Sequence, residues 1–171
     1  MKKSILWISF AVPYDKVGHA GGKTHNYYLK KLHEAGHDIE LVTFYNEDEY
    51  GKIDLDSYGI KHTLLPHKEG KRTFFDVIKK IRKHLNPFEK YDAFVFSYYK
   101  KQLQRTIVNL KKSSFNPSVV ILQWTQIAFF MPLIKKVFPE AKIIMIEEDI
   151  HYSAVERRIK AYKGIRGIIS K

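Results

Sequence analysis

The chain has 171 residues, of which 44% are hydrophobic and 14% aromatic, so we expect one packed globular domain rather than a disordered chain. It contains no cysteine, which excludes a disulfide framework and any thiolate metal site and fits a reducing cytoplasmic setting. Its formal charge of +12 predicts a basic surface facing an anionic partner, although a solvated charged surface explains the same count.

The first predicted element is a buried strand at residues 4–12, SILWISFAV, a nearly continuous apolar run. Two lysines precede it, as in a signal peptide, but the run is short and no small-x-small cleavage site follows. No run approaches the roughly 18 apolar residues of a membrane span. We therefore interpret residues 4–12 as a central strand that is covered on both faces.

Strands and helices then alternate along the chain. A glycine-containing loop leads into a helix whose apolar residues end near Ala35, and Gly36 supplies the stop. Further strands are predicted at residues 38–45, 60–66, 91–99, 118–124 and 141–149, and further helices at residues 73–85, 100–113, 125–138 and from Tyr152. Such alternation predicts an α/β fold, a doubly wound and mainly parallel Rossmann-like sheet with helices on both faces.

Gly21 and Gly22 stand between the first strand and the first helix. Glycines permit positive φ and close approach, and a helix N-terminus offers free N–H groups to an anion. The spacing is neither G-x-G-x-x-G nor G-x-x-x-x-G-K-[ST], so the dinucleotide and P-loop motifs are excluded. From these residues alone, a plain turn and a loop that approaches a phosphate both stay open.

The wider pattern is more specific. An apolar strand, a Pro13-Tyr14 loop, the two glycines, the stretch LHEAGHDIELVT at residues 32–43 and VVILQW at residues 119–124 follow one another. This order resembles the N-terminal domain of GT-B glycosyltransferases of the retaining family 4 type, over roughly residues 2–160. The resemblance implies that residues 1–171 form the acceptor-side domain of a longer enzyme whose nucleotide-sugar-binding domain is absent from this chain.

The resemblance also implies an activity: transfer of a sugar from a nucleotide-sugar donor to a glycan or lipid-linked acceptor, in cell-surface polysaccharide or glycolipid synthesis. Such enzymes retain the anomeric configuration and use no metal ion and no cofactor besides the co-substrate. By resemblance, Gly21 and Gly22 would bind the donor phosphates. We expect the isolated chain to be inactive, and the protein to be cytoplasmic, with peripheral contact at the inner face of the cell membrane.

Acidic residues follow the predicted strand at residues 141–149. Where family members often carry a His-Asn or His-Asp pair, this sequence has Glu148 and Asp149, with His151 two positions later. Acids crowded at the carboxyl end of a strand raise at least one pKa, which suits proton transfer, and we take these three residues as catalytic candidates. A helix N-cap at Asp149, with acids in the first turn, explains the same residues.

Three further residues are candidates for acceptor binding. Trp124 and Gln126 lie at the end of a predicted strand, on the same edge of the sheet, and His19 comes shortly before the glycines. Trp124 can stack on a sugar or lipid, or it can cap the core, since large aromatic residues usually pack. The remaining histidines show no metal-ligand spacing, so no metal site is predicted.

The predicted helix at residues 73–85 combines an apolar stripe with a crowded basic side. Residues 68–112 carry 13 Lys and Arg against four acids, a net charge of +9. This pattern is typical of a helix at an anionic membrane surface, although every surface helix of an α/β domain buries a stripe. The candidate membrane contacts are Phe74, Lys79, Lys80, Arg82 and Lys83. No nucleic-acid-binding motif is present, so nucleic acid is not expected as a partner.

Two other functions are open. The chain can be a non-catalytic α/β module that binds an anionic ligand or a membrane surface. It can also be another class of enzyme on a flavodoxin-like sheet, but we find neither the nucleophile nor the flavin loop that such an enzyme needs. The fold alone does not choose among these functions.

Overall fold

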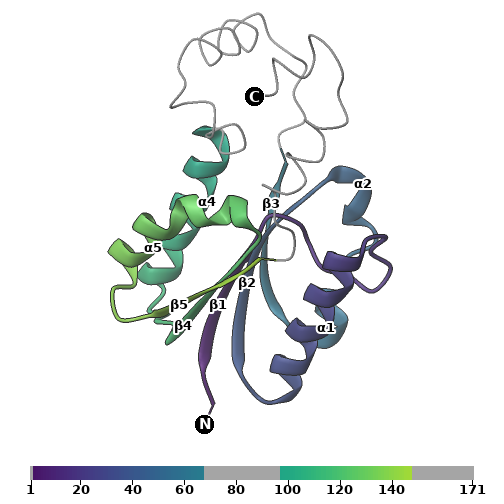
Figure 1. Ribbon diagram of the computed structural model, residues 1–171, viewed down its shortest axis with the longest axis horizontal. Coiled ribbons are helices and arrows are strands. Elements are labelled where there is room, and N and C mark those ends of the chain that lie inside the picture. The colour runs from purple at the N-terminus through teal and green to yellow at the C-terminus, as the bar shows by residue number, and fades with distance from the viewer. Residues whose placement is uncertain (1, 68–96, 148–171) are drawn as a thin grey trace, which may run out of the picture.

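The computed structural model describes residues 2–67 and 97–147, in which five strands form one sheet with helices on both faces (Figure 1). The elements are β1 (Ser4–Ser9), α1 (Ala20–Glu34), β2 (Asp38–Tyr45), α2 (Glu47–Tyr50), the 3-10 helix η1 (Leu55–Tyr58), β3 (Lys61–Pro66), α4 (Ser97–Lys112), β4 (Val119–Gln123), the 3-10 helix η2 (Thr125–Phe130), α5 (Met131–Val137) and β5 (Lys142–Ile146). The predicted α/β class with a mainly parallel sheet is confirmed.

The strand order is β3-β2-β1-β4-β5, and all four neighbouring pairs are parallel. The chain leaves the central strand β1 toward β2 and β3 and later returns to its other side at β4. The strand order therefore reverses between β1 and β4. In doubly wound sheets, ligands bind outside the carboxyl ends of the strands at such a switch point.

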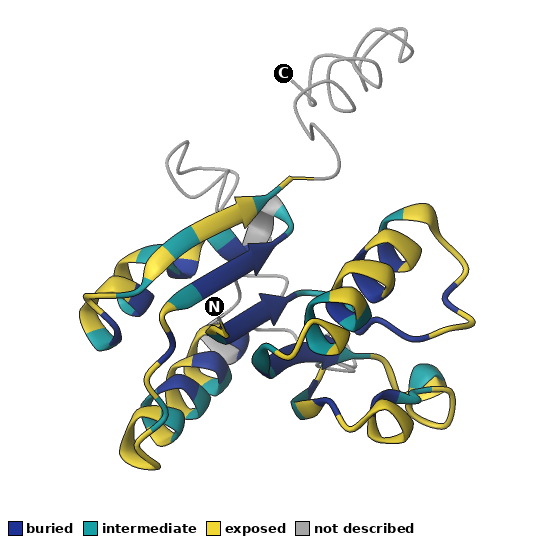
Figure 2. Cartoon of the chain, turned by 90° about the horizontal axis from the view of Figure 1, so that it is seen from below, coloured by how far each residue is buried: buried dark blue, intermediate teal, exposed yellow. Residues whose placement is uncertain are grey.

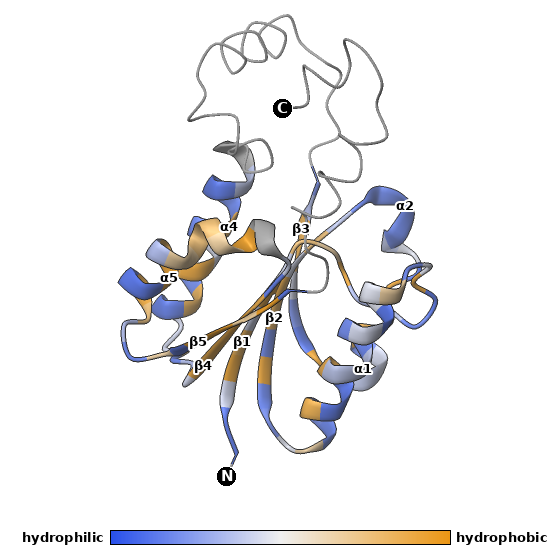
Figure 3. Cartoon of the chain, viewed as in Figure 1, coloured by the Kyte–Doolittle hydropathy of each residue, from blue (hydrophilic) through white to orange (hydrophobic). Residues whose placement is uncertain are grey.

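The strands bury apolar side chains on both faces because successive residues point to opposite sides. On one face, Leu29 of α1 packs with Trp7 and Leu41. On the other face, α4 and α5 pack against strand residues that include Leu6 and Val120. Figures 2 and 3 show the result, with buried apolar strands between helices whose outer sides are exposed and polar.

Several element boundaries differ from the sequence prediction, among them the last strand, which ends at Ile146 instead of residue 149. The first strand ends at Ser9 instead of residue 12, where the Ser9 hydroxyl bonds to the Ala11 carbonyl oxygen and the chain turns. Residues 97–99, predicted as the end of a strand, form the first turn of α4. The predicted helix at residues 125–138 is divided into η2 and α5, with Pro132 in the first turn of α5, where the missing N–H does no harm.

No helix within residues 2–67 and 97–147 is long and apolar enough to cross a membrane. The basic helix proposed to contact a membrane falls at residues 73–85, outside the described residues. Peripheral membrane contact therefore stays a prediction.

Candidate functional site

A row of buried polar residues crosses the carboxyl ends of the three central strands. Ser9 of β1 pairs in register with Thr43 of β2 and with Gln123 of β4, and all three have no exposed surface. The hydroxyl groups of Ser9 and Thr43 share a hydrogen bond of 2.7 Å. Buried polar side chains are costly unless they are hydrogen-bonded, so this row marks the switch-point edge as different from the apolar strands below it.

The loop after β1 brings His19 to the N-terminus of α1. Its backbone is extended, with φ −117° and ψ 151°, and its Nδ1 accepts a hydrogen bond of 2.9 Å from the Gly22 N–H. This is the geometry of an N-cap, in which a side chain satisfies one of the free N–H groups of the first turn. The Gly22 N–H, predicted to face a phosphate, is thus already bonded to His19.

Gly22 is required by packing. A Cβ atom at this position would lie 2.6 Å from Cγ2 of Val17 and 2.8 Å from Cε1 of His19. No side chain fits at these distances without moving the loop. The second glycine therefore lets the loop between β1 and α1 lie directly against the helix.

The first turn of α1 keeps other donors for a ligand. Ala20 and Gly21 occupy its first two positions, where backbone N–H groups have no partner within the helix. The first turn contains no acidic residue, so no carboxylate competes for the positive end of the helix dipole. Gly21 thus stays a predicted phosphate-binding residue through its N–H, while the role predicted for Gly22 is limited by its bond to His19.

His19 meets Trp124 at the switch point. The two rings contact edge to face, with centroids 6.1 Å apart and planes at 61°. His19 precedes α1, whereas Trp124 directly follows β4, so the contact joins the two loops on either side of the switch point. The structure therefore brings together two of the three residues predicted to bind an acceptor. The third, Gln126, lies in η2.

The backbone of Trp124 is unusual. Its φ of 78° and ψ of 140° are rare for a residue with a side chain. The Trp124 N–H donates to the carbonyl oxygen of Ile146 at 3.1 Å, and its carbonyl oxygen accepts from Ile127 N–H at 3.0 Å. These bonds hold Trp124 in place against the strain. Strained residues of this kind cluster at functional sites.

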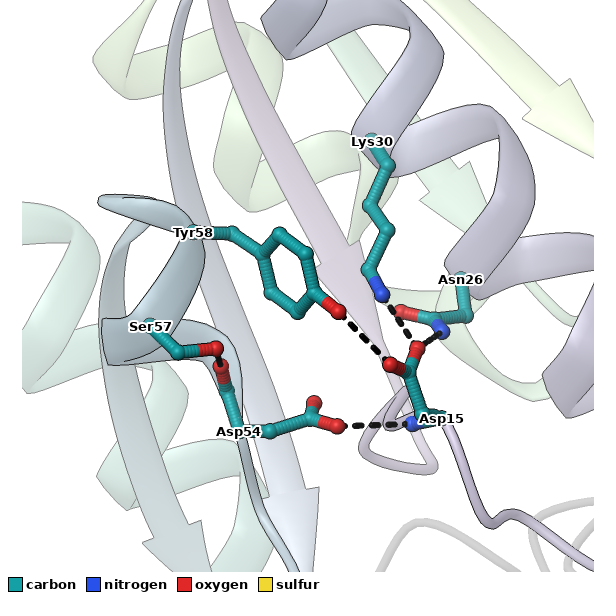
Figure 4. A network of polar contacts seen from close by, with 6 residues as sticks. All are labelled: Asp15, Asn26, Lys30, Asp54, Ser57 and Tyr58. Carbon is teal, nitrogen blue, oxygen red and sulfur yellow. Dashed lines mark hydrogen bonds and ion pairs between the residues drawn. The ribbon is translucent and has the colours of Figure 1, made fainter.

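Asp15 anchors the same loop to two other elements (Figure 4). Its carboxylate accepts hydrogen bonds from Asn26 at 2.7 Å, from Tyr58 at 2.7 Å and from Lys30, with which it also forms an ion pair. The Asp15 N–H donates to Asp54 at 3.1 Å. Lys30 also lies over the Tyr58 ring, 3.5 Å from its centroid. This Asp15 network ties the β1–α1 loop to α1 and η1.

The network changes the acidity of Asp15. Hydrogen bonds from Lys30 and then from Tyr58 lower the pKa of this carboxyl from 3.8 to about 2. Asp15 is therefore ionised at neutral pH, and its charge is compensated within the network.

An aromatic cluster beside the same edge was missed by the sequence analysis. His67, just after β3, packs against Phe10, Phe44 and Tyr99, with ring centroids 4.9 to 5.6 Å apart. Its Nε2 lies 3.2 Å from the Phe10 carbonyl oxygen and its Nδ1 3.4 Å from the Tyr99 hydroxyl. Burial lowers the pKa of His67, which favours the neutral ring. The four residues come from four separate segments, so no local pattern could have identified the cluster.

The remaining predicted residues lie outside the part of the chain that the structure describes. The catalytic candidates are Glu148, Asp149 and His151, and the membrane candidates are Phe74, Lys79, Lys80, Arg82 and Lys83. Within residues 2–67 and 97–147, no group of three or more histidine and acidic side chains could hold a metal ion.

Comparison with known proteins gives one informative result. No protein-family model matches the sequence, and no curated protein matches it. Among solved structures, the fold is similar to that of the C-terminal domain of a hydrogenase from Pyrococcus furiosus, with a TM-score of 0.52 and 12% identity. The match covers 85% of this chain and 92% of that domain. At this identity the likeness shows a shared fold alone.

The comparison overturns the glycosyltransferase interpretation. A solved structure that shares this fold is a hydrogenase domain, and no family model supports the predicted family. The assignment to GT-B glycosyltransferases, the transferase activity and the role in polysaccharide or glycolipid synthesis are therefore wrong.

The fold explains why the motif was misleading. Gly22 is needed for the close approach of Val17 and His19, and Gly36 ends α1 with a φ of 83°. Ile39 and Leu41 are core residues of β2. The residues that suggested a family thus build a strand–helix–strand unit, which many unrelated proteins share.

Proposed function

We propose that this domain binds a small phosphorylated ligand at the carboxyl edge of its sheet, between the β1–α1 loop and the end of β4. The observation that carries the proposal is the contact between His19 and Trp124 across the switch point. This contact joins His19, which caps α1, to Trp124, whose backbone conformation is strained. Both residues lie where doubly wound sheets bind ligands.

The chemistry of the edge favours an anion. The N–H groups of Ala20 and Gly21 and the positive end of the α1 dipole attract negative charge, and the first turn is free of acids. The net charge of +12 draws anions toward the domain from a distance. The Trp124 ring supplies an apolar surface for the part of the ligand that carries the phosphate.

The variant Ala20→Pro tests the proposal. Ala20 is the first residue of α1, where proline is well tolerated, and the extended backbone of His19 suits a residue that precedes proline. The change removes one N–H donor and leaves the helix intact. We expect calorimetric titration with inorganic pyrophosphate to show saturable binding to the unchanged protein and about tenfold weaker binding to Ala20→Pro, as for a lost charge-assisted hydrogen bond.

A matched control uses the other end of the same helix. His33→Gln changes a half-buried residue in the last turn of α1 and should leave pyrophosphate affinity unchanged. Titration with vesicles that contain anionic lipid separates a soluble phosphate from a lipid headgroup, which share the same chemistry. The proposal fails if the unchanged protein binds neither probe, or if Ala20→Pro binds as tightly as the unchanged protein.

A further inference from the structure

The cap of α1 depends on the protonation state of one side chain. Nδ1 of His19 accepts a hydrogen bond of 2.9 Å from the Gly22 N–H. A backbone N–H can only donate, so Nδ1 carries no proton while this bond exists, and the proton of the neutral ring lies on Nε2. A protonated imidazole has an N–H at both positions and accepts at neither. Uptake of a proton by His19 therefore breaks the cap.

Protonation of His19 changes the anion site in two ways. It releases the Gly22 N–H, so that Ala20, Gly21 and Gly22 all have N–H groups without a partner in the helix. It also places a positive charge beside the positive end of the α1 dipole, which is unfavourable until an anion lies between them. His19 is exposed, so a ligand reaches its ring.

We propose that His19 couples the uptake of a proton to the binding of phosphate. The neutral side chain caps α1, whereas the protonated side chain leaves the cap and donates a charge-assisted hydrogen bond to the phosphate. This inference rests on the phosphate site proposed for the first turn of α1. By linkage, the ligand binds more tightly as the pH falls through the range in which histidine gains a proton.

A buried residue under the same helix indicates a ligand independently. His25 lies one turn after Gly22, on the side of α1 that faces the sheet. It is 1% exposed, and its Nε2 has no hydrogen-bond partner among residues 2–67 and 97–147. Helix side chains lean toward the N-terminus, so His25 leans toward the turn that His19 caps. A buried polar atom without a partner is costly, which favours a bonding molecule at this turn.

His25 does not compete with His19 for the proton. Burial lowers the pKa of His25 from 6.5 to about 3, so its ring stays neutral at pH 5.5 and above. The two histidines of this turn therefore differ in their response to pH, and only the exposed one gains a charge.

Other charged groups near His19 come from three elements. They are Asp15 and Lys16 in the same loop, Lys23 in α1, and Glu147 directly after β5. The lysines oppose the uptake of a proton, and Glu147 favours it. The charge of Asp15 is compensated by its ion pair. A substitution at position 19 leaves all of these groups in place, so it isolates the effect of the His19 ring.

His19→Asn is the matched variant, because asparagine is a good N-cap that takes up no proton. Amide exchange of the full chain, followed by NMR, tests the cap without any ligand. At pH 8 the Gly22 amide should be similarly protected in both proteins. At pH 5.5 the unchanged protein should lose about fivefold of this protection, as for a lost N-cap, while His19→Asn keeps it.

Calorimetric titration with pyrophosphate at the same two pH values tests the coupling. Pyrophosphate takes up protons itself in this range, but it does so equally for both proteins. The ratio of their affinities therefore reports the His19 ring. We expect the affinity of the unchanged protein, relative to that of His19→Asn, to rise about tenfold from pH 8 to pH 5.5, as for one charge-assisted hydrogen bond.

The two measurements separate this inference from the proposed function. Loss of Gly22 protection together with the rise in relative affinity supports the coupling. Equal Gly22 protection in both proteins at pH 5.5 overturns it, even if pyrophosphate binds. A constant affinity ratio also overturns it and leaves the phosphate site intact. If neither protein binds pyrophosphate at either pH, the proposed function fails and the coupling fails with it, whatever the Gly22 amide shows.

Discussion

The Gly22 N–H donates a hydrogen bond of 2.9 Å to Nδ1 of His19, and this bond closes the first turn of α1 over the preceding loop. The bond requires the loop to lie against the helix at a distance that only glycine permits, because a Cβ atom would be 2.6 Å from Val17. One residue therefore sets both the cap and the position of the His19 ring.

We expect Gly22→Ala to destabilise the protein. Alanine favours a helix by about 1 kcal/mol over glycine, but overpacking typically costs about 1–3 kcal/mol, so a net loss of about 1 kcal/mol follows. Urea unfolding of both proteins measures this difference. Gly18→Ala is the control: its Cβ meets nothing within 4 Å, so its effect should stay within about 0.5 kcal/mol. A Gly22→Ala protein as stable as the original would contradict the packing argument.

Asp15 should make the protein sensitive to acid. Its pKa is lowered from 3.8 to about 2, so its contribution to stability is complete above pH 4 and is lost as the pH falls toward 2. Because 45% of the side chain is exposed, solvent screens the interaction, and we expect a contribution of about 1 kcal/mol. Asp15→Asn should lose this amount at pH 7, and the difference from the unchanged protein should shrink toward pH 2.

The matched change for Asp15 is Asp56→Asn. The Asp56 side chain is 97% exposed, and its pairing with His62 spans 3.9 Å. Urea unfolding at pH 7 should show little effect of this change. A loss equal to that of Asp15→Asn would mean that general surface charge, and not the Asp15 network, determines the effect.

The burial of His25 leads us to expect a second pH dependence of stability, over a different pH range. Its ring is stacked on Trp7 with centroids 4.9 Å apart, and burial lowers its pKa from 6.5 to about 3. Between these values the unfolded chain binds a proton that the folded protein does not, so stability falls as the pH drops below 6.5. The slope is about 1.4 kcal/mol for each pH unit, or about 2 kcal/mol between pH 6.5 and pH 5.

His25→Phe keeps a ring against Trp7 and removes the titrating group. We expect urea unfolding at pH 6.5 and pH 5 to show a loss for the unchanged protein that is about 2 kcal/mol larger than the loss for His25→Phe. His37 lies in the turn after α1 and is only half-buried. His37→Phe should therefore lose as much unfolding free energy between pH 6.5 and pH 5 as the unchanged protein does. An undiminished loss in His25→Phe would show that another group is responsible.

The fold was largely predictable because it depends on local patterns. The run DIELVTFY gave the bounds of β2, and Gly36 marked the end of α1, since alternation and stop residues are visible in a few neighbouring positions. The switch-point edge depends on distant contacts instead. His19 and Trp124 could each be suspected from their places after predicted strands, but their contact required the strand order.

Other features of the edge were not predictable for the same reason. The Asp15 network joins residues up to 43 positions apart, and the bond between Ser9 and Thr43 depends on strand register. The packing role of Gly22 was not predictable because a glycine needed for packing and a glycine needed for a ligand look alike in sequence. The family assignment failed for this reason too, since its motif describes a strand–helix–strand unit.

Trp124 allows the strain at the switch point to be measured. Its φ of 78° and ψ of 140° suit glycine and cost other residues about 1–3 kcal/mol. Trp124→Gly and Trp124→Ala both remove the indole ring, but only the glycine variant relieves the backbone. We expect Trp124→Gly to be more stable than Trp124→Ala by about 1–3 kcal/mol in urea unfolding.

The same pair of substitutions at Lys101 provides the control for Trp124. Lys101 is exposed in the interior of α4, where alanine should be the more stable variant by about 1 kcal/mol. If the glycine variant is the more stable one at Trp124 and the alanine variant the more stable one at Lys101, the difference at Trp124 comes from backbone strain and not from the loss of a side chain.

Both Trp124 variants also test how the ring takes part in binding. If the ring contacts only the organic part of the ligand, both variants should bind pyrophosphate about as tightly as the unchanged protein, because pyrophosphate has no organic part. Reduced pyrophosphate affinity in both Trp124 variants would show instead that the Trp124 ring acts on binding by holding His19 in position.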